Sequence, residues 1–223
     1  MNLANTLTVG RILVAPLVAL SPFSPSWIVR LAGFALFLVA AITDYWDGKI
    51  ARSHNIVTNL GKLLDPLADK LLLLATLVPI YVIQRSPPSG PVGDFDFVTP
   101  VGTSGLPLWA LLVVLGRELL MTVFRQLASR RGVIIAAIGP AKWKTGFQWT
   151  WVGAAFFWFA AITAARQYGW IGFAPWEAFA RFNGVVGVVS MWGAIALTLY
   201  SLGLYVRRYG GVLLGRAPAA RDF

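Results

Sequence analysis

Apolar runs recur along nearly the whole chain, and six of them are long enough to cross a bilayer. The hydrocarbon interior accepts only backbones that satisfy their own hydrogen bonds, and a spanning helix needs about 20 residues. We therefore predict an all-α polytopic membrane protein, with residues 1–223 forming a single integral membrane domain. Its six transmembrane helices are predicted over 5–23, 27–52, 60–84, 106–129, 144–166 and 181–207.

Composition excludes several other classes of protein. Of the 223 residues, 57% are hydrophobic and 13% are charged, whereas soluble domains carry roughly 25% charged residues. The absence of cysteine and the presence of one histidine exclude thiolate nucleophiles and His/Cys zinc sites. The net charge of +10 is interpreted as loop charge facing anionic membrane lipids, because no basic tract is long enough for a nucleic-acid-binding arm. No nucleic-acid partner is expected.

The basic residues also predict an orientation. Six spans place both termini on one side, together with the connections near 53–59 and 130–143, and most lysines and arginines gather there. The Gly- and Pro-rich segment 86–105 is predicted as a loop on the opposite side. That side has only Arg30, Arg85, Arg166 and Arg181. The positive-inside rule then places the termini in the cytoplasm.

Four aspartates lie at the predicted cytoplasmic ends of the second and third helices. Asp44 and Asp47 are three residues apart, and Asp65 and Asp69 are four apart, so each pair occupies one helical face. The short turn between the helices predicts antiparallel neighbours whose four carboxylates form one cluster. Such a cluster needs neutralising cations, and oxygen-only ligands favour Mg²⁺ or Mn²⁺.

The alternative interpretation is a salt-bridged, wet helix end without chemistry. The basic residues close enough in sequence for such pairing are Lys49, Arg52, Lys62 and Lys70. We favour the metal site because acids at membrane depth are costly and usually functional.

A second group of charges lies further along the chain. Arg117 and Arg125 belong to the fourth predicted helix, and Lys142 and Lys144 come at the start of the fifth. Together these residues predict a cationic pocket for a second phosphate, separate from the aspartate cluster. Lipid-headgroup and orientation charge is the alternative interpretation, which we prefer for Arg130 and Arg131.

Residues 44–69 satisfy every position of the pattern D-x2-D-G-x2-A-R-x8-G-x3-D-x3-D. In this the chain resembles the CDP-alcohol phosphatidyltransferase family. The resemblance implies that Asp44, Asp47 and Asp65 bind divalent metal together with the diphosphate of a CDP-lipid. Two ions are expected, because two can neutralise the diphosphate and stabilise the leaving group. It implies that Asp69 shares in metal binding and acts as the general base on the acceptor hydroxyl. The remaining CDP-lipid-binding positions that it implies are Gly48, Ala51, Arg52 and Gly61.

The N-terminal segment also resembles this family, particularly the branch that uses glycerol phosphate. Asn5, Thr8 and Arg11 recur every three residues and could contact the nucleotide or its phosphates. The alternatives are helix capping by Asn5 and a snorkelling Arg11.

Residues 116–122 and 142–145 also resemble this branch, although Ala141 stands where glycine is expected. This implies transfer of a phosphatidyl group from CDP-diacylglycerol to glycerol 3-phosphate by a homodimer. The expected location is the bacterial inner (cytoplasmic) membrane, and the charge distribution predicts an active site that faces the cytoplasm. Inositol phosphate, inositol or serine remain alternative acceptors. An ion-coupled transporter and a structural membrane protein are the alternatives from other classes.

Overall fold

Six helices dominate the computed structural model, which describes residues 3–53, 59–85, 95–130 and 139–213. Within these ranges the side chains of 3–5, 45–53, 59–63, 65, 140–142 and 211–213 are not described. The helices are α1 (Leu3–Leu20), α2 (Trp27–Ser53), α3 (Asn59–Gln84), α4 (Leu108–Arg130), α5 (Gly139–Tyr168) and α6 (Ala174–Leu213), with a 3₁₀ turn, η1 (Ser21–Phe23), after α1.

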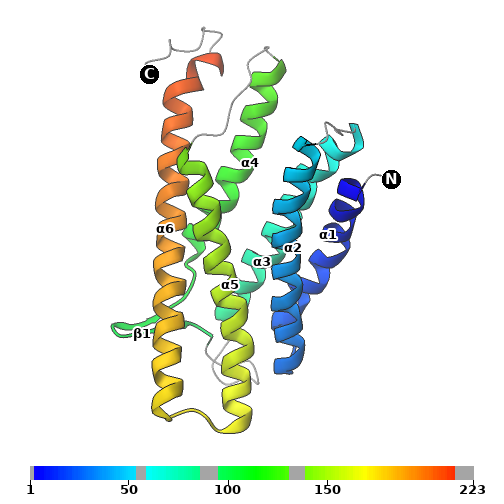
Figure 1. The fold of residues 1–223 in the computed structure, drawn as a ribbon. Helices are drawn as coiled ribbons and strands as arrows, with labels where there is room; N and C mark the ends of the chain where they lie inside the picture. The colour runs from blue at the N-terminus through cyan, green and yellow to red at the C-terminus, as the bar shows by residue number, and fades with distance from the viewer. Residues whose placement is uncertain (1–2, 54–58, 86–94, 131–138, 214–223) are drawn as a thin grey trace.

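The six helices confirm the predicted helix count and order. Successive helices run in alternating directions, so α1 begins and α6 ends at the same end of the bundle (Figure 1). By length and composition, helices α1, α2, α3 and α6 each contain a stretch among the described residues that could cross a membrane. Helix α4 is less apolar because Arg117, Glu118 and Arg125 lie within it.

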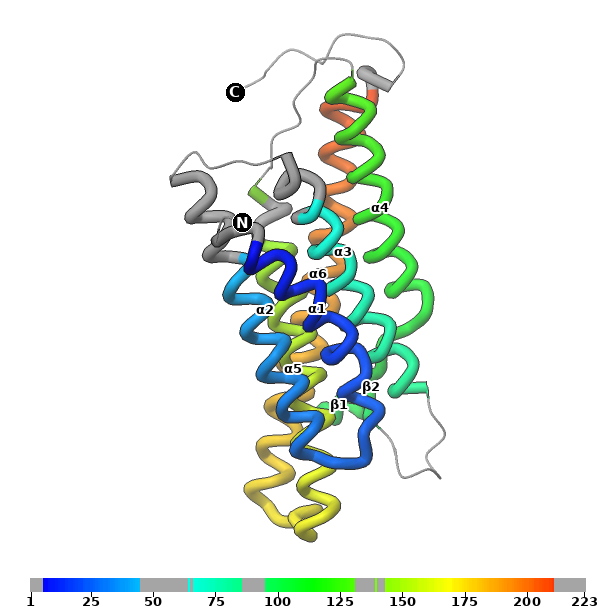
Figure 2. Tube along the Cα trace, turned by 90° about the vertical axis from the view of Figure 1, so that its right-hand side faces the viewer, coloured from blue at the N-terminus to red at the C-terminus, as the bar shows by residue number. Residues whose placement is uncertain are grey.

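The bundle has two halves that meet through α2 and α5. In the first half α1 packs against both α2 and α3, and in the second α6 packs against α5 and α4. Figure 2 shows the same arrangement from the side, with α1 in front of the bundle. Stacked rings join the halves, since Phe37 of α2 lies 5.5 Å from the Trp149 ring and 5.8 Å from the Phe156 ring of α5.

One part of the predicted neighbour relation needs correction. We expected α2 and α3 to pack directly against each other as antiparallel neighbours. In the described part of the chain α1 contacts both helices extensively, whereas direct contact between α2 and α3 is marginal at most. Helix α1 therefore mediates between the two helices that carry the aspartates.

A small β-hairpin lies in the segment that was predicted as a loop. Strands β1 (Phe97–Thr99) and β2 (Gly102–Ser104) pair antiparallel, with Phe97 opposite Ser104. Gly102 has φ of +127°, a conformation that favours glycine at this tight connection. In the described residues this hairpin is thus the sole β-structure beside the helices.

Glycines of α6 make room for the hairpin. A Cβ atom at Gly184 would meet the Val98 carbonyl oxygen, and one at Gly187 would meet the Phe97 ring. Small residues let segments approach closely where lipid provides no hydrophobic drive for helix association. The hairpin is therefore held against α6 by close packing.

Arg30, predicted on the side opposite the termini, is internal and only 1% exposed. Its Nε donates to the Ser24 carbonyl at 2.7 Å, and its Nη1 donates to the Thr163 hydroxyl at 2.5 Å. The guanidinium also lies 4.4 Å from the Phe95 ring centroid. This side chain ties α2 to α5 and to the segment that leads into the hairpin.

Candidate active site

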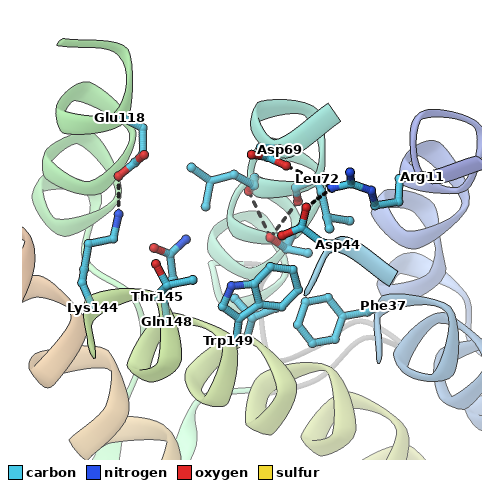
Figure 3. Close-up of a pocket in the computed structure, with 13 residues that line it drawn as sticks. Arg11, Phe37, Asp44, Asp69, Leu72, Glu118, Lys144, Thr145, Gln148 and Trp149 are labelled. Carbon is cyan, nitrogen blue, oxygen red and sulfur yellow. Dashed lines mark hydrogen bonds and ion pairs between the residues drawn. The ribbon is translucent and has the colours of Figure 1, made fainter. Parts of the chain in front are cut away.

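A cavity that is partly open to solvent lies between the two halves of the bundle, with about 680 Å³ of space inside it and at its mouth. Charged side chains line its two ends, with Arg11, Asp44 and Asp69 on one side and Glu118 and Lys144 on the other (Figure 3). Five helices contribute to it, so it depends on the whole packing arrangement. The remaining lining residues are Phe37, Leu72, Leu73, Thr76, Thr145, Gln148, Trp149 and Val152.

Arg11 organises the aspartate end of the cavity. Its Nη1 atom is paired with Asp44 Oδ1 and donates to Asp69 Oδ1 at 3.0 Å. The Arg11 side chain is 3% exposed, whereas those of Asp44 and Asp69 are 34% and 57% exposed. The arginine therefore lies behind the two carboxylates, which remain open to a ligand in the cavity.

The helix packing explains why these residues meet. Helix α1 lies against both α2 and α3, so one side chain of α1 can reach a carboxylate on each. Thr8, one turn before Arg11, is fully buried and is not part of the cavity lining. The structure thus presents Arg11 to the aspartates and encloses Thr8 in the packing.

The opposite end contains an ion-paired lysine. Lys144 Nζ is paired with Glu118 Oε1, and Arg117 Nη1 donates to the same oxygen at 2.8 Å. Lys144 is 5% exposed and Arg117 is 7% exposed. Only Glu118 and Lys144 of these three line the cavity, because the Arg117 guanidinium also reaches Ser201 of α6.

The predicted cationic pocket is therefore divided in the structure. Lys144 lies in the cavity wall, Arg117 is directed toward α6, and Arg125 is exposed on α4 outside the cavity lining. Residues eight apart on a helix differ in direction by about 80°, given 3.6 residues per turn. That difference explains how Arg117 is buried while Arg125 is exposed.

Several predicted site residues lie outside the described side chains. Helix α2 continues through the positions of four of them, and α3 includes two more. Among the side chains that are described, no group of three acidic residues is placed to hold a metal ion. The predicted site residues without described side chains are Asn5, Asp47, Gly48, Ala51, Arg52, Gly61, Asp65 and Lys142.

Sequence reasoning missed the wall of the cavity that α5 forms between the two charged ends. Thr145, Gln148, Trp149 and Val152 follow Lys144 along α5 and all line the cavity. Their spacing of three, four and seven residues from Thr145 is that of one helical face. Extending the face of Lys144 along α5 would have found them.

These features define a membrane-embedded helical bundle with a cavity that has charged side chains at both ends. A model of the CDP-alcohol phosphatidyltransferase family matches residues 1–200. The chain belongs to this family.

Curated relatives cover most of the same region. The chain is similar to the CDP-diacylglycerol–glycerol-3-phosphate 3-phosphatidyltransferase of Bacillus subtilis (strain 168), with 36% identity over 161 residues, 66% of this chain and 72% of the relative. An enzyme of the same name from Rickettsia felis is 46% identical over 147 residues, 66% of this chain and 70% of the relative. A chloroplastic/mitochondrial relative from Arabidopsis thaliana, with that name and the number 1, is 30% identical over 229 residues, 96% of this chain and 64% of the relative.

Proposed function

We propose that this enzyme transfers the phosphatidyl group of CDP-diacylglycerol to glycerol 3-phosphate, giving phosphatidylglycerophosphate and CMP in phospholipid biosynthesis. Family membership supports the reaction class, and the names of the relatives support both substrates. The observation that carries the proposal is one cavity with open carboxylates at one end and a buried lysine at the other. Such a cavity suits two phosphate-containing substrates that must meet.

The aspartate end suits an oxygen-liganded divalent ion. Two partly exposed carboxylates share one arginine there, so negative charge remains for a further cation. We propose that two Mg²⁺ or Mn²⁺ ions are held by Asp44, Asp47, Asp65 and Asp69. When bound, these ions neutralise the diphosphate and stabilise CMP as the leaving group.

Asp69 is the proposed general base, because its carboxylate is the more exposed of the two that contact Arg11. It accepts the proton of the acceptor hydroxyl. The hydroxyl oxygen then forms a bond to the phosphorus of the phosphatidyl group, while the bond from that phosphorus to the CMP oxygen breaks. CMP leaves with the bonding electrons, and no covalent enzyme intermediate is needed.

The other ligand-binding roles follow from position and family resemblance. Lys144 binds the phosphate of the acceptor at the far end of the cavity. Lys142 and Arg125 supply further positive charge, and Arg117 adds its charge from behind Glu118. The CDP-lipid is held by Arg11 and by the residues that the family resemblance adds, which are Asn5, Gly48, Ala51, Arg52 and Gly61. Thr8, which was predicted with them, is enclosed in the packing and is left out of the proposal. Inositol would leave Lys144 without an anionic ligand, and serine would offer it a carboxylate but no phosphate.

We further propose that the end of the bundle with both termini faces the cytoplasm of a bacterium, in the inner membrane. The excess of basic residues at that end supports this orientation. A homodimer is the proposed assembly, on family resemblance.

An acceptor panel tests the proposed function. Purified enzyme receives CDP-diacylglycerol, Mg²⁺ or Mn²⁺ and one acceptor, and release of CMP is measured. Glycerol 3-phosphate should give the fastest release, and a chelator should abolish it. Faster release with inositol phosphate, inositol or serine would refute the proposed acceptor, and undiminished release in chelator would refute the metal.

A further inference from the structure

Glu118 occupies the junction between the cavity and the second half of the bundle. Its Oε1 atom is paired with Lys144 on the cavity side and accepts a hydrogen bond from Arg117 Nη1, at 2.8 Å, on the other. Lys144 belongs to α5 and Arg117 to α4. A single carboxylate oxygen therefore connects the lysine of the cavity wall to a buried arginine behind it.

The connection continues into α6. Arg117 Nη2 donates to Ser201 Oγ at 3.1 Å, and Ser201 donates its own hydroxyl proton to the Thr198 carbonyl at 3.1 Å. Because that proton is committed to Thr198, a lone pair of the Ser201 oxygen is directed at Arg117. The Tyr205 ring packs against the same guanidinium, with its centroid 5.9 Å from Arg117 Cζ. Arg117 is thus held from three directions.

We propose that Glu118 is a positioning residue for the acceptor, holding the Lys144 ammonium at the cavity wall, and that Arg117 and Ser201 fix Glu118 from behind. The inference rests on the proposed use of a phosphorylated acceptor. Lysine is a point charge on a flexible four-carbon chain, so it needs such a partner to present its charge in one place.

A count of charges explains why the arginine is needed. Glu118 and Lys144 alone would be neutral and would attract a phosphate weakly. Arg117 adds one positive charge, so the three side chains carry a net charge of +1. When Lys144 binds an incoming phosphate, the Glu118 carboxylate can therefore keep its bond to Arg117. Without Arg117, the same step would leave the carboxylate without a cationic partner.

Kinetics of three variants test this proposal, with each substrate varied in turn. Glu118→Gln keeps the shape of the side chain but removes the charge that holds Lys144. We expect its KM for glycerol 3-phosphate to rise about tenfold, the size of one lost charge-assisted hydrogen bond. Its KM for CDP-diacylglycerol should stay within about twofold, because the aspartate end is unchanged.

Ser201→Ala acts at the far end of the connection and removes no charge. We expect a rise of about two- to fivefold in the KM for glycerol 3-phosphate, since a neutral group is lost that only orients Arg117. Ser190→Ala is the matched control, because Ser190 is also a buried serine of α6. It should leave both KM values unchanged.

Inorganic phosphate provides a readout that does not depend on the acceptor. Its inhibition constant should rise in Glu118→Gln in step with the KM for glycerol 3-phosphate. An unchanged or lower KM for glycerol 3-phosphate, or an equal rise for both substrates, would overturn the positioning role. If Glu118→Gln does not fold, Ser201→Ala decides, and its equivalence to Ser190→Ala would overturn the proposal.

The same measurements separate this inference from the proposed function. A wild-type enzyme that prefers a neutral alcohol would refute glycerol 3-phosphate as the acceptor. Weaker phosphate inhibition in Glu118→Gln would still support the positioning of Lys144 by Glu118.

Discussion

Arg11 lies behind two carboxylates that are themselves open to the cavity. One guanidinium balances only one of the two negative charges, so these three side chains keep a net negative charge. The arrangement also keeps Asp44 and Asp69 at fixed positions on separate helices. At the scale of single residues, a change at Asp69 therefore tests proton transfer, and a change at Arg11 tests charge balance.

Replacement of Asp69 by Asn should remove the proposed base while keeping its size. We expect CMP release to fall by about 10²- to 10⁴-fold, the usual contribution of a positioned base. Binding of CDP-diacylglycerol, measured directly, should remain. Glu177→Gln, which removes a carboxylate from the first turn of α6, is the control and should be fully active. Full activity of the Asp69→Asn variant would exclude Asp69 as the base.

Replacement of Arg11 by Met should make stability depend more strongly on divalent ions. Without the guanidinium, Asp44 and Asp69 repel each other, at a cost below the roughly 3–5 kcal/mol of a broken buried pair because both carboxylates are partly exposed. Bound Mg²⁺ would offset part of this loss, since an ion that binds only the folded state stabilises it.

The measurement is the midpoint of thermal unfolding in detergent, with Mg²⁺ and with EDTA. Chelation should lower the midpoint of wild type, and should lower that of Arg11→Met further. Arg85→Met, at an exposed arginine beyond the end of α3, should behave like wild type. An equal response to EDTA in the Arg11 and Arg85 variants would contradict the shared role of Arg11 and metal.

At the scale of the elements, close packing of the hairpin on α6 makes a sharp prediction. Gly184→Ala would place a Cβ against the Val98 carbonyl of β1, and overpacking of this kind costs about 1–3 kcal/mol. Gly203 lies in the same helix with open space beside it, so Gly203→Ala should gain up to about 1 kcal/mol of helix propensity. Thermal unfolding should show opposite shifts for the two variants. Shifts of the same sign and size would contradict the packing argument.

The helices were predictable because apolar run length is a strong signal, but the starts of two of them were not. Helix α5 begins at Gly139 and was predicted from 144, and α6 begins at Ala174 and was predicted from 181. In both cases a proline, Pro140 or Pro175, is the second residue. The predicted helices start after these prolines, whereas a proline in the first turn costs no helical hydrogen bond.

The hairpin was not predictable for a different reason. Strands of three residues are too short to show an alternating pattern. Their stability depends on α6, whose contacting glycines are more than 80 residues away. A local pattern in the sequence cannot carry that information.

The site was predictable only in part. The spacing of the aspartates indicated their cluster, and the structure brings Asp44 and Asp69 together at Arg11. The partner of Arg11 could not be predicted, because it depends on α1 lying between α2 and α3. In the same way, the direction of the Arg117 side chain, toward α6 and away from the cavity, depends on Ser201, which is distant in the sequence.

At the scale of the whole molecule, α5 and α6 are longer than a bilayer requires. Helix α6 has 40 residues, or about 60 Å at 1.5 Å per residue, twice the roughly 30 Å of a hydrocarbon core. The connection between α5 and α6 extends beyond the other helices at the end opposite the termini (Figure 1). Trp170 and Phe173 are exposed there, as suits side chains at a membrane–water interface.

The orientation of the bundle can be tested cleanly because the chain has no cysteine. Val101 is 98% exposed in the hairpin connection, and Ser129 is exposed near the end of α4. The hairpin and this end of α4 lie toward opposite ends of the bundle (Figure 1). In spheroplasts, a membrane-impermeant maleimide should label the Val101→Cys variant before lysis and the Ser129→Cys variant only after it. Both variants should keep CMP release, because neither position lines the cavity. Labelling of the Ser129→Cys variant in intact spheroplasts would place the basic end outside, contrary to the charge asymmetry.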